Sequence, residues 1–286
     1  MSPAMVLEGV TLHGDINTSD EVLLAHVESA IRRGLPQVWP QAACGERIAL
    51  VGGGPSLADT EGELVDLIHR GAKLVTLNGA YDWCRARNLR PSAQIVLDAR
   101  EANARFVAAD VPDCRYLLAS QCHPAVFEAV ADRANVWLWH AVAAREGPVA
   151  AALDAYYLQR WTPIPGGTTV AMRALILLRT LGFLRFDLFG IDSCWLDGQH
   201  HAFEQPENAG DRQVRCTVAP SDRPDLARDF VCAPWHCQQL DDFLHTVRLR
   251  GQDFQLRVHG RGLLAYVLEA AALSADDDPT IHFQQE

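Results

Sequence analysis

Short apolar runs alternate with amphipathic stretches along most of the chain, beginning at residue 47. Apolar runs without internal alternation are typical of strands that are buried on both faces of a parallel sheet. The stretches between them have the apolar spacing of helices that cover such a sheet. The pattern predicts an α/β fold with an open, mainly parallel, doubly wound (Rossmann-like) sheet. The predicted strands are 48–51, 74–77, 93–97, 116–119, 136–139 and 186–189, and the predicted helices are 57–70, 79–89, 100–109, 124–133 and 168–181.

The same pattern divides the chain into three parts. Residues 1–44 are expected to form an N-terminal helical appendage, in which Ser19 or Asp20 caps a helix with one apolar face. Residues 45–273 form the Rossmann-like domain, and residues 274–286 are an acidic tail. Within the domain one long stretch is polar and without a clear period, and a structureless loop of this length is usually functional, mobile or a misread element. That loop is 195–232, followed by a helix at 235–250, a strand at 254–258 and a helix at 262–273.

Composition narrows the classes of partner. The chain has 286 residues and a formal net charge of −11, which argues against binding to nucleic acid. No apolar run approaches the roughly 20 residues that span a bilayer, and the first residues lack the pattern of a signal peptide. We therefore expect a cytoplasmic protein without a membrane span, whose oligomeric state the pattern leaves open. The eight cysteines form no Cys-x-x-Cys pair, and even the closest two, Cys232 and Cys237, are expected to be reduced, buried thiols.

A glycine-rich turn follows the first predicted strand. Glycines let a backbone turn tightly and approach a ligand, and a helix that starts at the carboxyl edge of a sheet is a ready anion site. Ser56 is expected to cap the following helix, with Asp59 in the position of a capping box. A tight turn with no ligand remains an alternative. The turn consists of Gly52, Gly53, Gly54, Pro55 and Ser56.

The two best-known phosphate-binding motifs are excluded by spacing. A P-loop requires a lysine after its last glycine, and the only lysine in the chain is Lys73. A dinucleotide fingerprint requires a third glycine where Leu57 stands, and an acid after the second strand where Asn78 stands. Asn78 is instead a candidate contact to a base or a ribose, although a simple turn explains it equally well.

A second glycine turn precedes the predicted helix at 168–181. Thr168 can cap that helix. Two such turns, each at the start of a helix, could hold the two ends of one phosphorylated ligand. The second turn consists of Gly166, Gly167, Thr168 and Thr169.

Acids and histidines complete the set of candidates. Asp98 and Asp192 follow predicted strands and could bind Mg²⁺ or a ribose hydroxyl, although Asp98 could instead cap the helix near Arg100. His200 and His201 lie in the polar loop after Asp192, where a histidine can remove a proton from a hydroxyl nucleophile. Because adjacent side chains diverge, only one of the two is expected to face the site.

Three sequence blocks resemble a known family, the MptE-like family. It comprises archaeal 6-hydroxymethylpterin diphosphokinases and bacterial motility accessory factors, which are in turn related to the bacterial sialyltransferases of glycosyltransferase family 42. Order and spacing agree across residues 45–260. The blocks are Val51-Gly-Gly-Gly-Pro-Ser-Leu57, Gly167-Thr-Thr-Val170 with Leu181-Gly-Phe183, and Gly190-Ile-Asp192 with Asp197-Gly198 and His201-Ala202.

The resemblance implies a nucleotide-dependent transferase but leaves its reaction open. One implied reaction moves a nonulosonic (sialic-acid-like) sugar from a CMP-sugar donor to a small-molecule or glycan acceptor, with a histidine as general base. The alternative is an ATP- and Mg²⁺-dependent diphosphokinase acting on 6-hydroxymethylpterin or a similar alcohol, with Asp98 and Asp192 as metal ligands. A third possibility is a nucleotide-binding module without catalysis. Sugar transfer is favoured, because a chain with one lysine is poorly equipped to neutralise a triphosphate.

Overall fold

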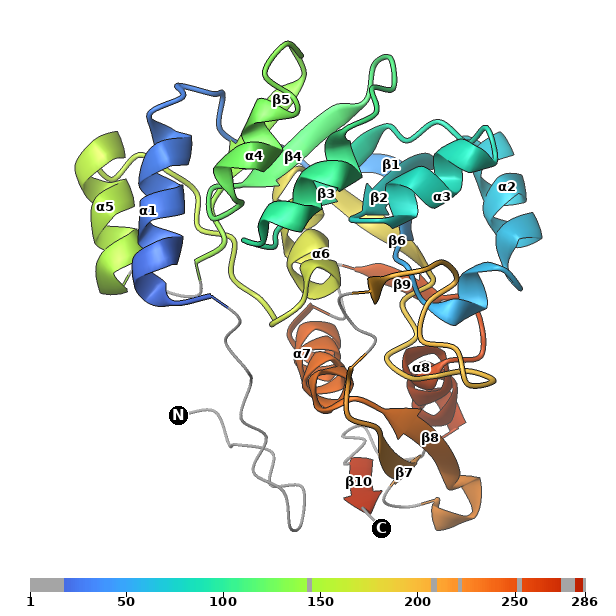
Figure 1. The fold of residues 1–286 in the computed structure, drawn as a ribbon. Helices are drawn as coiled ribbons and strands as arrows, with labels where there is room; N and C mark the ends of the chain where they lie inside the picture. Colours follow the sequence, from blue (N-terminus) through green and yellow to red (C-terminus); the bar gives the residue numbers. More distant parts are fainter. Residues whose placement is uncertain are drawn as a thin grey trace.

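Seven strands, all parallel, form the central sheet of the computed structural model, in the order β5-β4-β3-β2-β1-β6-β9 (Figure 1). This confirms the predicted doubly wound α/β class. The structure describes residues 18–142, 146–206, 210–220, 223–250, 254–273 and 281–284. The strands of the sheet are β1 (Cys44–Val51), β2 (Lys73–Leu77), β3 (Ala93–Val96), β4 (Arg115–Ala119), β5 (Val136–Trp139), β6 (Phe183–Phe189) and β9 (Gln255–Val258).

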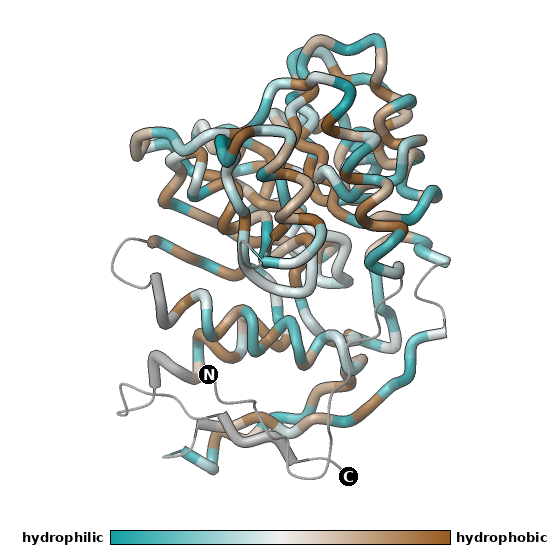
Figure 2. Tube along the Cα trace, turned by 90° about the vertical axis from the view of Figure 1, so that its left-hand side faces the viewer, coloured by the Kyte–Doolittle hydropathy of each residue, from teal (hydrophilic) through white to brown (hydrophobic). Residues whose placement is uncertain are grey.

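Both faces of the sheet are covered, as the continuous apolar runs predict. In β1, Ile48 and Leu50 belong to the larger core cluster, which also contains the apolar side of α6. Their neighbours Ala49 and Val51 point to the opposite face and join the cluster formed with α2 and α3. Figure 2 colours the chain by hydropathy, and brown, apolar stretches run through the packed upper part of the molecule. The helices around the sheet are α2 (Glu61–His69), α3 (Ala80–Ala86), α4 (Pro124–Glu128) and α6 (Val170–Thr180).

Two predicted helices take a different form. The stretch 57–70 splits into a short 3₁₀ turn, η1 (Pro55–Leu57), and α2. The stretch 100–109 is a 3₁₀ helix, η2 (Glu101–Val107). At its start the Asp98 carboxylate accepts the Arg100 N–H at 2.9 Å. A polar side chain that bonds to the backbone two residues on favours a turn over a regular helix.

The polar stretch 195–232 contains two strands, so the sequence pattern misread this part of it as a structureless loop. They form a small antiparallel sheet in the order β10-β7-β8, at the end of the molecule where α7 and α8 lie (Figure 1). The first two residues of β8 are exposed and only its last three are buried or partly buried, so this edge strand carries no continuous apolar run. The elements are β7 (Val214–Pro220), η4 (Pro224–Leu226), β8 (Arg228–Cys232), α7 (Pro234–Arg250), α8 (Leu263–Leu273) and β10 (Ile281–Gln284).

The N-terminal helix α1 (Asp20–Ile31) begins, as predicted, after Ser19, whose hydroxyl accepts the Val22 N–H. Its buried side chains, among them Val27, belong to the same core cluster as the sheet. It lies beside α5 (Gly147–Tyr157), a helix that the sequence pattern did not predict (Figure 1). Residues 1–17 of the predicted appendage lie outside the described residues.

Candidate functional site

The candidate site lies where the winding of the sheet reverses, at the carboxyl ends of β1 and β6. From β1 the chain moves to β2 on one side, whereas β6 and β9 lie on the other. Ligands of open α/β sheets bind in the crevice at such a switch point. Val51 is paired with Phe189, so the two glycines that follow these strands, Gly52 and Gly190, are neighbours. The Gly52 N–H donates to the Phe189 carbonyl at 2.8 Å, and the Gly54 N–H donates to the Gly190 carbonyl at 2.7 Å.

Close backbone approach explains why the first turn is built of glycines. A Cβ atom on Gly52 would lie 2.6 Å from the Gly190 carbonyl oxygen. A Cβ atom on Gly54 would lie 2.3 Å from a carboxylate oxygen of Asp192. Side chains at these positions would push apart the two strand ends that form the crevice.

Asp192 occupies the anion position of this turn. Its side chain is 4% exposed, and its Oδ2 accepts the Ser56 N–H at 3.0 Å. Burial raises the pKa of Asp192 to about 6, and the hydrogen bonds from Ser56 oppose this rise only in part. A buried carboxylate with a raised pKa in a crevice is typical of a functional site.

The expectation that Ser56 caps a helix was wrong. Pro55 takes the first position of η1, so the cap position falls on Gly54, and Ser56 lies inside the 3₁₀ turn. α2 begins only at Glu61. The Ser56 N–H is thereby released from the helix and used to bind Asp192.

His201 is the histidine that contacts the glycine turn. Its Nδ1 lies 3.2 Å from the Gly53 carbonyl oxygen, which also accepts the Ala202 N–H at 3.0 Å. Because a carbonyl can only accept, Nδ1 carries the proton and Nε2 of the neutral ring keeps its lone pair. The Phe203 ring lies over the same turn, since Cβ atoms on Gly53 and Gly79 would approach it to 2.8 and 2.6 Å.

His200 turns toward α7 instead, where His236 donates a hydrogen bond to its Nε2. The Ala233 N–H donates to His236 Nδ1 at 2.9 Å, so the neutral His236 ring carries its proton on Nε2. That Nε2 lies 3.2 Å from His200 Nε2 and donates to it. Burial and the neighbouring His201 lower the pKa of His200 to about 4, and burial also lowers the pKa of His236 well below its usual value. His200 is therefore neutral at pH 7 and lies in ring contact with His201, with ring centres 4.2 Å apart.

The second glycine turn also holds a carboxylate of the chain itself. The N–H and the hydroxyl of Thr168 donate to Asp242 Oδ2 at 2.7 and 2.9 Å. Thr169, not Thr168, is the N-cap of α6, and its hydroxyl accepts the Met172 N–H. Gly166 and Gly167 have φ angles of +102° and +58°, which favour glycine.

α7 links the second turn to the histidines. Asp242 and His236 both belong to this helix, and six residues correspond to about 9 Å along a helix axis. The described contacts of the second turn are with α7 and α6 rather than with the first turn. The two turns are thus connected through α7 and the imidazole pair.

Asp98 and Asp192 do not come together. They follow β3 and β6, and two strands, β2 and β1, lie between these in the sheet. Three strand spacings amount to about 14 Å, whereas Mg²⁺ binds oxygen at about 2 Å. One ion held by both carboxylates is excluded by this strand order. Asp98 is instead paired with the Arg100 guanidinium at 2.5 Å.

Asn78 lies at the end of β2 with a φ angle of +46°, a conformation that asparagine tolerates in turns. Its carbonyl accepts the Gln94 amide at 2.9 Å.

Three residues near the site were not predicted from the sequence, namely Phe203, Asp242 and Gly262. Gly262 packs against Asp192. Gly262 is the fourth residue after the end of β9 and lies at the carboxyl edge of the sheet. This position is the feature from which the sequence could have predicted it as a site residue.

A separate cavity of about 470 Å³ lies at the opposite, amino-terminal edge of the sheet. Its lining includes the strand starts Lys73, Arg115 and Phe183, and none of the predicted site residues. The only lysine of the chain is therefore remote from the glycine turn, and it pairs with Glu46 at 2.9 Å.

Within the described ranges, no helix combines the length and the apolar character needed to cross a membrane.

The fold and the site define a Rossmann-like α/β protein with a glycine turn, a buried carboxylate and a histidine at its switch point. The sequence model of one family, described as "6-hydroxymethylpterin diphosphokinase MptE-like", matches residues 31–227. The chain belongs to this MptE-like family, which confirms the resemblance identified from the three sequence blocks.

A solved structure with the same fold is that of the MAf glycosyltransferase from Magnetospirillum magneticum AMB-1. It shares 16% sequence identity with this chain at a TM-score of 0.56. The match covers 92% of this chain and 42% of the glycosyltransferase chain, so this chain spans less than half of that protein. No curated protein matches the sequence.

Proposed function

We propose that this chain is a nucleotide-dependent glycosyltransferase. It moves a nonulosonic sugar from a CMP-sugar to an acceptor hydroxyl, and His201 is its general base. The observation that carries this proposal is the hydrogen bond between His201 Nδ1 and the Gly53 carbonyl. Because that carbonyl binds the Nδ1 proton, Nε2 is the ring nitrogen that can accept a proton beside the glycine turn at the switch point.

The proposed step needs one proton acceptor. Nε2 of His201 takes the proton of the acceptor hydroxyl while that oxygen bonds to the anomeric carbon of the sugar. The bond between the anomeric carbon and the phosphate oxygen breaks, and CMP leaves with the electron pair. The Gly53 carbonyl stabilises the imidazolium that forms, because Nδ1 keeps its hydrogen bond throughout. A positioned general base of this kind contributes about 10²- to 10⁴-fold in rate.

The charges around the site suit a monophosphate better than a triphosphate. Asp192 and Asp242 fill the anion positions of the two turns, and the chain's only lysine is at the other edge of the sheet. Asp192 can accept a hydrogen bond from a ribose hydroxyl. The N–H of Gly53 has no partner among the described residues and can donate to the donor nucleotide.

The second candidate is the diphosphokinase named in the family description. It transfers a diphosphate from ATP to a pterin alcohol, a reaction that usually depends on Mg²⁺. Either Asp98 or Asp192 could hold the ion together with the nucleotide phosphates, but not both at once.

Calorimetry with CMP, CDP, ATP and S-adenosylmethionine, each with and without Mg²⁺, separates these functions. CMP binding that does not depend on Mg²⁺, with CMP release from a CMP-sugar, supports sugar transfer. Mg²⁺-dependent binding and cleavage of ATP would replace it with the diphosphokinase. His201→Ala should reduce CMP release by about 10²- to 10⁴-fold, while His69→Ala, a change at an exposed histidine of α2, should leave it unchanged. CMP binding without turnover on any acceptor, unchanged by either substitution, would identify a binding module without catalysis.

A further inference from the structure

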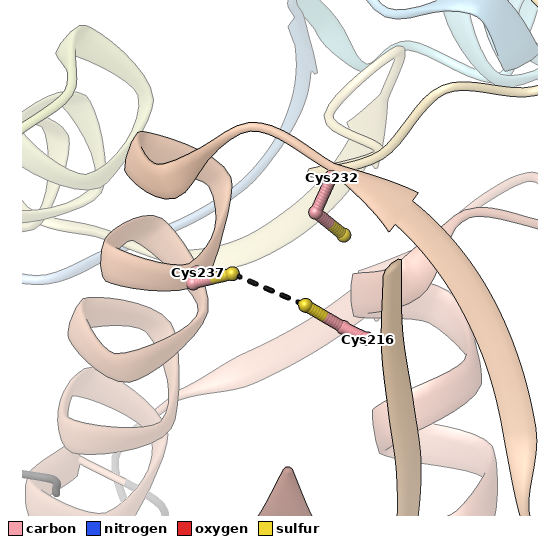
Figure 3. Close-up of side chains that lie close together, drawn as sticks. All are labelled: Cys216, Cys232 and Cys237. Carbon is pink, nitrogen blue, oxygen red and sulfur yellow. Dashed lines mark hydrogen bonds between the residues drawn. The ribbon is translucent and has the colours of Figure 1, made fainter. Parts of the chain in front are cut away.

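Three buried cysteines from three different elements meet beside α7 (Figure 3). Cys216 belongs to β7, Cys232 ends β8, and Cys237 lies in the first turns of α7. Cys216, Cys232 and Cys237 are 4%, 0% and 4% exposed, respectively. The sulfurs of Cys216 and Cys237 are 3.5 Å apart, and all three sulfurs lie within 4.8 Å of one another.

This spacing fits three thiolates that share one metal ion. Zinc–sulfur bonds are about 2.3 Å long, so two sulfurs on a tetrahedral ion are about 3.8 Å apart, and on a trigonal ion about 4.0 Å. A disulfide would instead require a separation of about 2.05 Å. The separation of 3.5 Å and the upper limit of 4.8 Å lie on either side of these values, so shifts of up to about 1 Å would bring the three sulfurs to one ion.

The chemistry of the three side chains fits the same interpretation. Thiolates are the ligands that zinc(II) and copper(I) prefer, and metal binding releases the thiol protons.

We propose that Cys216, Cys232 and Cys237 bind one thiophilic d¹⁰ metal ion, zinc(II) or copper(I). Copper(I) is satisfied by three thiolates, whereas zinc(II) takes a fourth ligand as well. The ion links the β7–β8 hairpin to the start of α7 and so stabilises the packing of these elements. It does not depend on the proposed transferase reaction.

The site adjoins the imidazole pair. Cys237 directly follows His236, which donates to His200. The sulfur of Cys232 lies 3.5 Å from the carbonyl oxygen of Ser193, the residue after Asp192, and a metal ion would replace the proton that now bridges these two atoms. An ion at the three cysteines would therefore fix the start of α7, which carries His236, to the β7–β8 hairpin.

Metal titration of the full-length chain tests the proposal. The protein is reduced, stripped with a chelator and titrated with Zn²⁺ or with Cu⁺ under anaerobic conditions, each against a competing chelator. Elemental analysis should find one equivalent of one of the two ions per chain. Co²⁺ as a spectroscopic probe should show thiolate-to-cobalt charge-transfer absorption. The variants Cys216→Ser, Cys232→Ser and Cys237→Ser should lose the ion, whereas Cys84→Ser, a change at another buried cysteine, should keep it.

A second measurement avoids dependence on variants that fail to fold. In the wild-type chain, the bound ion should protect these three cysteines from alkylation, as read by mass spectrometry of the peptides. Binding of neither ion to the wild-type chain would refute the proposal. So would equal binding by the wild-type chain and a variant without all three thiols, or alkylation of the cluster that metal leaves unchanged.

Discussion

The charge on Asp192 should destabilise the folded chain at neutral pH. Burial raises the pKa of this carboxyl from 3.8 to about 6, so the folded protein holds a proton that the unfolded chain has already released. The free energy of unfolding therefore falls as the pH rises from about 4 to about 6. A difference of about two pKa units corresponds to about 3 kcal/mol. Asp192 is almost fully buried, so solvent screening does little to reduce this value.

The substitution Asp192→Asn removes this titration and keeps an oxygen that can accept the Ser56 N–H. Between pH 4 and pH 8 the wild type should lose about 3 kcal/mol of stability relative to the variant. Urea unfolding of both proteins at half-unit pH steps measures the difference, in which the titrations of all other groups cancel. The variant should also lose transferase activity, because a carboxylate that costs stability is retained for function.

Asp66→Asn is the matched control, since Asp66 is an exposed acid on α2. Its stability curve should run parallel to that of the wild type. The reasoning is refuted if the curve of Asp192→Asn also runs parallel to the wild-type curve, or if the variant loses stability relative to wild type as the pH rises.

Three further predictions concern neighbouring groups. His201→Ala should reduce turnover by about 10²- to 10⁴-fold with little change in the melting temperature, and loss of stability with unchanged turnover would contradict it. Gly54→Ala should cost about 1–3 kcal/mol by urea unfolding, because its Cβ would lie 2.3 Å from a carboxylate oxygen, while Gly62→Ala, with no atom within 4 Å, should not. His259 is partly desolvated, but hydrogen bonds to Asp187 at 2.8 Å and to a second acid outweigh this and raise its pKa. His259→Gln should therefore be less stable than wild type below pH 6, and the gap should narrow as the pH rises above the raised pKa; a gap that does not change with pH would contradict this.

The sheet and the family were readable from the sequence. A strand buried on both faces is apolar at most of its positions, so the runs at β1 to β6 carry a local signal that needs no knowledge of neighbours. The glycine turn after β1 and the Asp192 block are equally local, and they identified the MptE-like family. The strands β7 and β8 were not predicted, because partly exposed strands in a polar stretch lack that signal.

The contents of the site were decided by tertiary structure. Sequence spacing marked both turns as anion sites, but only the fold brought Asp192 to the first and Asp242 to the second. The strand order also separated Asp98 from Asp192, although each follows a strand in the same way.

The cysteines and histidines show the same difference between what the sequence predicts and what the tertiary structure decides. The sequence placed Cys232 near Cys237, but Cys216 joins them only because β7 pairs with β8 beside α7. Likewise, His200 and His201 are equivalent as neighbours in the chain, and packing against α7 and the glycine turn gives them different partners. Local patterns specify which residues form a strand or a turn. Which of these elements meet depends on contacts between distant segments, which no local window of the sequence contains.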